Sequence, residues 1–341
     1  MIVAVIMVAL LGVGAMVIDL GALYVEKRQL QNGADAAALA VAQDCAGGDC
    51  GDEVATSRQY ADLNSNDGQS AVDLVCGKGA GLTPCVAPAP AGAANATGWV
   101  RVVTSTKTAS GTEVDFVLAP VMDSLAGSTV HAGAVAAWGA LGTYRTIRFI
   151  ISECEFQQMG GNLATQTFPT GVSYIYSKKG TAKDDKNNDP PCTSSSSGGT
   201  VAGNFAWLDA DAGDICRATV TAGMIVGGNP GNDPEISKKD CAAVFAAMKA
   251  GEEFVMPIFN QVVGTGQSAQ YTVAGFIGFR FTGWQLSGNS WPAGFSCPDP
   301  YTGQPGGGDL RCFRGTFTRV VSDGGGFGGI DYGARVVKMV G

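Results

Sequence analysis

Ten cysteines are the side chains of this 341-residue chain most able to build a covalent or metal site. They are Cys45, Cys50, Cys76, Cys85, Cys154, Cys192, Cys216, Cys241, Cys297 and Cys312. Zinc sites use close pairs of cysteines or combine them with histidines, but this chain has no Cys-x-x-Cys pair and a single histidine. An even number of cysteines at irregular spacings is typical of disulfides formed in an oxidising compartment. We therefore expect most of the chain to lie outside the cytoplasm.

The cysteine spacing indicates three local disulfides. Cys45 and Cys50, and also Cys76 and Cys85, are close enough in sequence to close small loops. Cys297 and Cys312 bracket a loop rich in proline and glycine. The remaining four, Cys154, Cys192, Cys216 and Cys241, can pair in three ways, and the sequence does not choose among them.

Other patterns that could support chemistry have simpler explanations. His131 would have to serve any Ser-His-Asp or Cys-His system, but it lies in an apolar run, and we expect a packed or partly exposed residue there. Residues 209–214 resemble a calcium loop, yet Val220 stands where an EF-hand needs a bidentate glutamate, so we expect a surface turn. Residues 227–231 are glycine-rich but lack the Lys-Ser/Thr of a P-loop. The sequence predicts a protein with no cofactor and no catalytic site.

Composition narrows the partners and the class of fold. The formal net charge of −8 is spread along the chain without blocks, which argues against a nucleic-acid partner. Only 15% of the residues are charged and 50 are glycine, a balance that favours strands, turns and long loops over helical bundles.

The N-terminal segment predicts a membrane anchor followed by a stalk. Residues 1–18 carry no charge, and a helix of about 20 apolar residues spans a bilayer core. Residues 29–43 are rich in alanine and contain no proline, so the same helix can continue out of the membrane. We expect a transmembrane anchor at residues 1–25 and a helical stalk at residues 26–45. The alternative is a cleaved secretory signal, with residues 38–40 as the cleavage site, but the apolar run is too long and no basic residue precedes it.

Five residues of this helix are candidates for contacts in the membrane. Gly12, Gly14 and Gly21 are small residues of the kind that lets helices approach closely in lipid. Asp19 is either a contact with a partner helix or a carboxylate at the level of the lipid headgroups, and the second reading is favoured because charge is costly at membrane depth. Tyr24 follows at a position where interfacial aromatic residues are found.

Beyond the stalk, the pattern predicts two further parts and an α+β fold. Residues 46–143 combine a helix at 54–63 with strands at 71–76 and 99–106, and a short helix at 119–125, as a small α+β module. Residues 144–341 contain strand candidates separated by turn-rich segments, and one helix at 238–251. We expect this part to be a mostly-β, disulfide-stabilised ectodomain.

The N-terminal sequence resembles that of a known protein family. The segments Val17-Ile-Asp-Leu-Gly-Ala-Leu-Tyr24 and Arg28-Gln-Leu-Gln-Asn-Gly-Ala-Asp-Ala-Ala-Ala-Leu-Ala40 are similar to the start of TadE/TadG-like proteins, membrane-anchored components of tight-adherence (Flp) pilus systems. A weaker resemblance to the ectodomain of actinobacterial members is carried by Gly203-Asn-Phe-Ala-Trp-Leu-Asp209, Gly228-Asn-Pro-Gly-Asn232, Tyr271-Thr-Val-Ala-Gly-Phe-Ile-Gly-Phe279 and Arg311-Cys-Phe-Arg-Gly-Thr-Phe-Thr318.

The resemblance implies a non-catalytic role. The chain would be a minor pilin, pseudopilin or assembly factor, single-pass in the cytoplasmic membrane, with its C-terminal part outside and with the cell surface or the pilus as further locations. Its partners would be the membrane and either pilus subunits or proteins of the assembly platform. An anchored adhesin or ligand-binding ectodomain outside the filament is the rival reading, and a secreted hydrolase is the third.

Topology adds one expectation about the start of the chain. Lys27 and Arg28 follow the apolar run and no basic residue precedes it, so the positive-inside rule would place the C-terminal side in the cytoplasm. The cysteines place it outside. Members of the family usually carry a short basic segment before the apolar run, and we expect the reading frame to extend upstream and supply it.

We predict that the ectodomain holds up to five disulfides and no free reactive thiol. Each closed loop typically stabilises a fold by about 2–4 kcal/mol, so reduction should loosen the C-terminal part. Alkylation of the denatured but unreduced protein, read by mass spectrometry, should label no cysteine. Labelling of several cysteines would show that the argument about the compartment is wrong.

Overall fold

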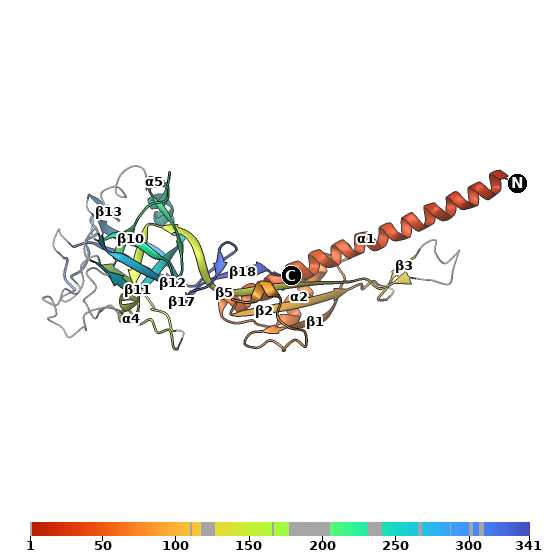
Figure 1. Ribbon diagram of the computed structural model, residues 1–341, viewed down its shortest axis with the longest axis horizontal. Helices are drawn as coiled ribbons and strands as arrows, with labels where there is room; N and C mark the ends of the chain where they lie inside the picture. The colour runs from red at the N-terminus through yellow and green to blue at the C-terminus, as the bar shows by residue number, and fades with distance from the viewer. Residues whose placement is uncertain are drawn as a thin grey trace. The chain divides into compact units, whose positions relative to one another are not determined.

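The chain forms two compact units, which are described separately (Figure 1). The first consists of Met1–Gly139 and Val337–Gly341, and the second of Ala140–Val336. The structure, a computed structural model, describes residues 2–109, 111–116, 127–165, 167–176, 205–230, 241–264, 268–286, 288–299, 303–306 and 310–341, except for the side chains at 2, 4, 5, 8, 9, 11, 15, 205, 229 and 230.

Unit 1 is a long helix and a short helix packed on an antiparallel sheet. The helices are α1 (Ile2–Gly47) and α2 (Glu53–Leu63). The sheet runs in the order β1 (Ala71–Lys78), β2 (Gly98–Ser105), β5 (His131–Ile147) and β18 (Ala334–Met339). A hairpin of β3 (Val114–Asp115) and β4 (Gly127–Ser128), and the short helix η1 (Ala91–Ala93), complete the unit.

The C-terminal half of α1 packs on this sheet through a face of alanines. Ala34, Ala37, Ala38, Ala42 and Ala46 are at most 1% exposed. Their spacing of three and four residues places them on one side of a helix. They belong to one core cluster with Val100, Val102, Ala134, Ala136 and Trp138 of the sheet. Because alanine has only a methyl group, the helix backbone can lie close to the strands.

The helix α2 begins and packs for identifiable reasons. Asp52 caps its N-terminus, and its carboxylate accepts the backbone N–H of Ala55 at 2.9 Å. Gly33 of α1 faces Ala61 of α2, and a Cβ at Gly33 would lie 3.2 Å from the Ala61 Cα. The glycine therefore permits the close approach of the two helices.

Unit 2 is built around a closed ring of five strands. They are β6 (Phe149–Ser152), β8 (Phe205–Leu208), β10 (Ile225–Pro230), β11 (Glu253–Val263) and β12 (Gln270–Leu286). The ring order is β10–β8–β6–β11–β12, and β12 pairs back with β10. The β6–β11 pair is parallel and the other pairs are antiparallel. A closed ring leaves these strands without a free edge where they pair.

Further strands and two short helices complete unit 2. The strand β14 (Cys312–Thr318) pairs β12, and β7 (Ser173–Tyr176) pairs β14. Two short strands, β13 (Asn289–Trp291) and β17 (Ile330–Asp331), also pair β12. Outside the ring, β9 (Arg217–Thr221) and β16 (Gly326–Phe327) pair β5, and β15 (Val320–Ser322) pairs β18. The helices are α4 (Glu153–Gln158) and α5 (Ala242–Lys249).

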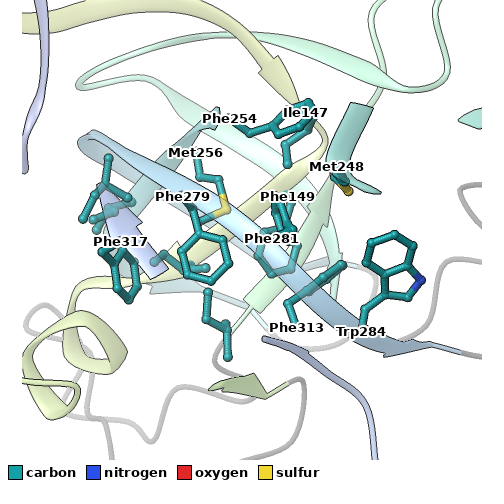
Figure 2. Packing of buried hydrophobic residues seen from close by; sticks show 14 of the residues in the cluster. Ile147, Phe149, Met248, Phe254, Met256, Phe279, Phe281, Trp284, Phe313 and Phe317 are labelled. Carbon is teal, nitrogen blue, oxygen red and sulfur yellow. The ribbon is translucent and has the colours of Figure 1, made fainter. Parts of the chain in front are cut away.

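Aromatic side chains fill the core of unit 2 (Figure 2). Phe281 packs edge-on against Phe313 with ring centroids 5.3 Å apart, and Phe149 packs against Phe313 at 4.6 Å. Phe279 meets Phe317 at 5.0 Å. Residues on opposite faces of β11 and β12 belong to two different core clusters, so both faces of these strands are buried. This explains why they read as nearly continuous apolar runs.

Four disulfides are described, and each lies within one unit. Cys45–Cys50 and Cys76–Cys85 are in unit 1, and Cys216–Cys241 and Cys297–Cys312 are in unit 2. They include the three local pairs that the spacing indicated. Among the four cysteines left open, the structure selects the Cys216–Cys241 pair; Cys154 is also disulfide-bonded, and Cys192 lies outside the described residues.

The predicted fold class is confirmed as α+β, with an N-terminal helix and a mostly-β C-terminal part. The helix expected at 54–63 and the strands expected at 71–76 and 99–106 are present. The strand β11 was not predicted, and the short helix expected at 119–125 lies outside the described residues. In the described part of the chain, no helix combines the length and the apolar character needed to cross a bilayer, so the anchor expected at residues 1–25 is not confirmed.

We predict that Ala37→Leu destabilises unit 1 by about 1–3 kcal/mol, because added methylenes in a tightly packed core force strain. Ala37 is fully buried against the sheet. The matched control is Gln43→Leu on an exposed position of the same helix, which should change stability by less than about 0.5 kcal/mol. Urea denaturation measures both variants. Equal effects would contradict close packing of the alanine face.

Candidate functional site

The N-terminal half of α1 carries a continuous series of exposed apolar side chains. Its side chains that are at least 50% exposed are Val3, Ile6, Met7, Leu10, Val13, Met16, Val17, Ile18, Leu20, Tyr24 and Val25. From Leu30 onward the helix is buried on one side by unit 1. One helix therefore has a docked half and a projecting half. A contiguous exposed apolar surface of this kind marks a site for a membrane or another protein.

Two of the three predicted glycines, Gly14 and Gly21, lie on the open surface of the projecting half. A Cβ added at Gly14 or Gly21 would meet nothing within 4 Å. The two are seven residues apart, which places them on one side of the helix. Gly12 is half-buried. Tyr24 is 58% exposed, and the Arg28 guanidinium lies over its ring at 4.7 Å from the centroid.

Asp19 lies on a different side of the helix from these glycines. It is 6% exposed, although Ile18 and Leu20 are 56% and 54% exposed. At about 100° per residue, Asp19 is roughly 140° around the helix from Gly14 and 160° from Gly21. The structure therefore does not bring Asp19 into one seam with Gly14 and Gly21. The burial of this carboxylate was not anticipated from the sequence.

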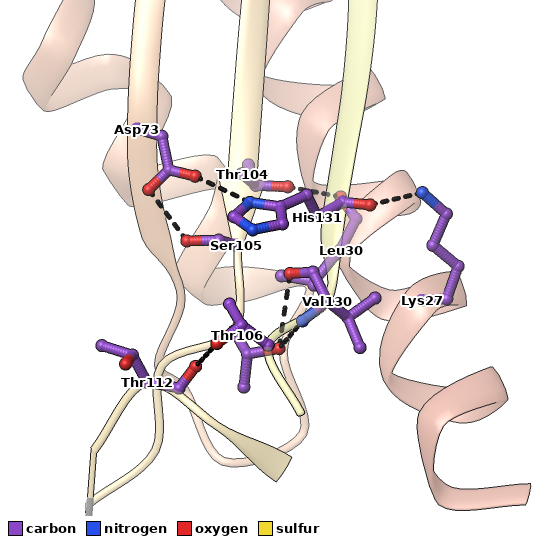
Figure 3. Close-up of polar contacts among 10 residues, drawn as sticks. Lys27, Leu30, Asp73, Thr104, Ser105, Thr106, Thr112, Val130 and His131 are labelled. Atoms are coloured by element: carbon purple, nitrogen blue, oxygen red, sulfur yellow. Dashed lines mark hydrogen bonds and ion pairs between the residues drawn. The ribbon is translucent and has the colours of Figure 1, made fainter. Parts of the chain in front are cut away.

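Polar contacts hold α1 to the sheet at the point where the projecting half begins (Figure 3). The Lys27 ammonium donates to the carbonyl oxygen of His131. The Thr104 hydroxyl donates to the carbonyl oxygen of Leu30 at 3.0 Å, and the Gln31 amide donates to that of Gly133 at 3.1 Å. These contacts define what we call the junction: Lys27, Leu30 and Gln31 on α1, with the facing atoms on β2 and β5. The junction marks the point at which the projecting half leaves the sheet.

The junction also contains the only histidine, in an arrangement unsuited to nucleophilic catalysis. Asp73 accepts the Ser105 hydroxyl at 2.8 Å through one carboxylate oxygen, and its other oxygen lies 3.2 Å from His131 Nδ1 (Figure 3). In a Ser-His-Asp triad the histidine must contact the serine as its base. Here the aspartate stands between them. His131 is exposed on the surface, the more open of the two settings expected from the sequence.

Burial alters the acidity of one carboxyl group at the junction. Desolvation raises the pKa of Glu26 above its ordinary value of 4.5, and the Asp67 carboxylate acts in the same direction. A hydrogen bond from the Thr106 hydroxyl favours the ionised form and opposes them, but the net direction is upward.

The candidate calcium loop of unit 2 is a turn closed by ion pairs. Arg145 bridges Asp211 and Asp214, with N–O distances of 3.1 and 2.6 Å. Asp211 also accepts the backbone N–H of Thr219 at 2.7 Å, and hydrogen bonds from Thr219, together with Arg145, lower the pKa of Asp211. These carboxylates are therefore engaged by protein donors, as the predicted surface turn requires. No cluster of three potential metal ligands occurs among the described residues.

Two features of the site were missed from the sequence. Gly33 is the only glycine in residues 29–43, and its isolation inside a helical tract was the available signal for close packing. Thr104 lies in a β-branched strand pattern that indicates a strand but does not show which hydroxyl will contact a helix carbonyl.

Comparison with known proteins gives a family match that covers the N-terminal part of the chain. Residues 1–44 match the family model described as Putative Flp pilus-assembly TadE/G-like. The match covers the projecting half of α1, the junction on that helix and most of the alanine face. A search of curated proteins and a search of solved structures each gave no match.

We predict that Glu26→Gln stabilises unit 1 at pH 7. Because the pKa of Glu26 is raised on folding, ionisation opposes folding once the pH exceeds about 4.5, and the penalty is complete above the folded-state pKa. The stability difference between variant and wild type should therefore shrink as pH falls towards 4.5. Urea midpoints at several pH values measure it, with the exposed Glu252→Gln as control. A difference that does not depend on pH would contradict the burial argument.

Proposed function

We propose that this chain is a non-catalytic, membrane-anchored component of a Flp/Tad-type pilus. The observation that carries the proposal is the division of α1 into a projecting apolar half and a half docked on unit 1. The family match over residues 1–44 supports a role associated with the pilus. Within that role, we favour a minor pilin or pseudopilin, since the projecting helix is shaped to join other helices.

The dimensions of the projecting half support membrane storage. Residues 3–25 span about 35 Å at a rise of about 1.5 Å per residue, similar to the hydrocarbon core of about 30 Å. Burying exposed apolar area contributes about 25 cal/mol per Å², which favours lipid or neighbouring helices over water. Lys27, together with Arg28 stacked on Tyr24, follows at the end of the segment, where cationic and aromatic side chains meet headgroups.

The open glycine side of α1 supports lateral packing. Lipid supplies no hydrophobic driving force between helices, so close contact at small residues becomes important. Gly14 and Gly21 provide such a surface because nothing within the described chain covers it. The disulfides support a location of both units outside the cytoplasm, in the periplasm or on the cell surface.

An adhesin outside the filament is the second candidate. The separate core and size of unit 2 favour it, because such a unit can present a binding surface without entering a filament. In that case α1 would be a tether, and its sequence would matter only for insertion.

We predict that Gly14→Leu leaves the protein folded and in the membrane but lowers its recovery with sheared pili about tenfold. The added side chain meets open space in the isolated chain, and leucine favours a helix more than glycine does. A loss of about 1.4 kcal/mol in packing corresponds to this factor. Quantitative mass spectrometry of pili and membranes measures both pools.

The controls separate a packing helix from a tether. Ala22→Leu adds bulk at an exposed position on another side of α1 and should have a smaller effect. Replacing residues 1–25 with an unrelated apolar helix should keep membrane localisation and abolish any pilus phenotype, and Asp19→Ala should affect assembly more than insertion. Normal piliation with the replaced helix would refute the packing role and favour the adhesin.

A further inference from the structure

The covalent path of the chain shows that unit 2 is an insertion into unit 1. The chain leaves unit 1 after Gly139, within β5, and returns at Val337, within β18. In unit 1 these two strands are neighbours in the sheet. Neighbouring strands lie about 4.8 Å apart, so the exit and entry points of unit 2 are close together. Such a geometry is the one in which an inserted domain is tolerated without disturbing its host.

Unit 1 is completed by the returning residues and needs no core residue from unit 2. Val337 is 4% exposed in the same core cluster as the alanine face of α1. Val340 donates its backbone N–H to Val135 at 2.9 Å, and Val135 donates to Gly341 at 3.2 Å. All members of this cluster belong to unit 1, whereas the two largest clusters of unit 2 consist only of residues 141–336.

We infer that the assembly module is made by the two ends of the chain alone, and that unit 2 is an autonomous, replaceable insert displayed by that module. The assembly role of this module rests on the proposed pilus function, whereas the division into two separate cores rests on the structure alone. Unit 2 then has no part in positioning α1, and its sequence is free to serve a separate binding task. Loss of its packing should not reach the junction or the alanine face.

Hydrogen exchange on the full-length, oxidised protein tests the structural part. The matched variants are Val273→Ala in β12 and Val100→Ala in β2, both at most 1% exposed. Pulse labelling along a urea gradient, read by mass spectrometry, gives a midpoint for each peptide. Val273→Ala should lower the midpoints of unit 2 peptides alone, those of β11 and β12 among them. Val100→Ala should lower those of unit 1 peptides alone, including β2 and α1 beyond Leu30. If either variant lowers the midpoints of both units together, the inference is overturned.

A second variant covers the case in which Val273→Ala is too mild. Phe279→Ala removes a fully buried ring from the aromatic core of unit 2. It should lower the unit 2 midpoints further while those of β2 remain within error of wild type. Two outcomes would show that the clusters are not independent cores and would reject the inference. In the first, Phe279→Ala also lowers the midpoints of unit 1. In the second, neither variant lowers the midpoints of unit 2.

Recovery with sheared pili then separates this inference from the proposed function. Phe279→Ala should be recovered with pili at a level within about twofold of wild type, while Gly14→Leu is lost. If Gly14→Leu is recovered normally, the proposed function fails and the insertion stands on the exchange data. If neither Gly14→Leu nor Phe279→Ala is recovered with pili, although the unit 1 midpoints of Phe279→Ala are unchanged, the insert takes part in assembly and the inference fails.

Discussion

The packing of an alanine face against a sheet is the interaction on which the arrangement of this protein depends. A helix faced with methyl groups can approach the strands closely, and the junction then fixes where it departs from them. The docked half determines the direction of the projecting half, which lacks described partners along most of its apolar surface. Larger side chains at Ala34, Ala37 or Ala38 would move the helix away from the sheet and from α2, where Gly33 already allows the closest approach. A set of small residues thus determines how closely the docked half of α1 lies on the sheet.

The sequence was most informative where structure is local. Alanine-rich periodicity predicted the helix through residues 29–43, alternating β-branched residues predicted β2, and cysteine spacing indicated three disulfides. It failed where pairing is distant. The strand β11 is a run of apolar residues interrupted by Pro257, so it showed neither alternation nor a clear strand signal. Its parallel pairing with β6 joins segments about a hundred residues apart, which no local pattern encodes.

In the functional site, too, local features could be predicted from the sequence and tertiary features could not. The types of residue in α1 pointed to the projecting segment, because charge and hydropathy are properties of the sequence itself. The burial of Asp19 and its separation from the glycine side depend on what covers the helix, and this is a tertiary property. His131 shows how the fold decides between two settings that the sequence left open: apolar neighbours on β5 face the core, while the alternation of a strand turns the histidine outward.

The place of Val337 in unit 1 has a consequence for the order of folding. The helix α1 precedes β18 along the chain, so synthesis produces the helix well before the strand that completes its sheet. The alanine face of α1 therefore lacks part of its core until β18 has been made. Unit 1 reaches its complete core only after the residues of unit 2 have been synthesised.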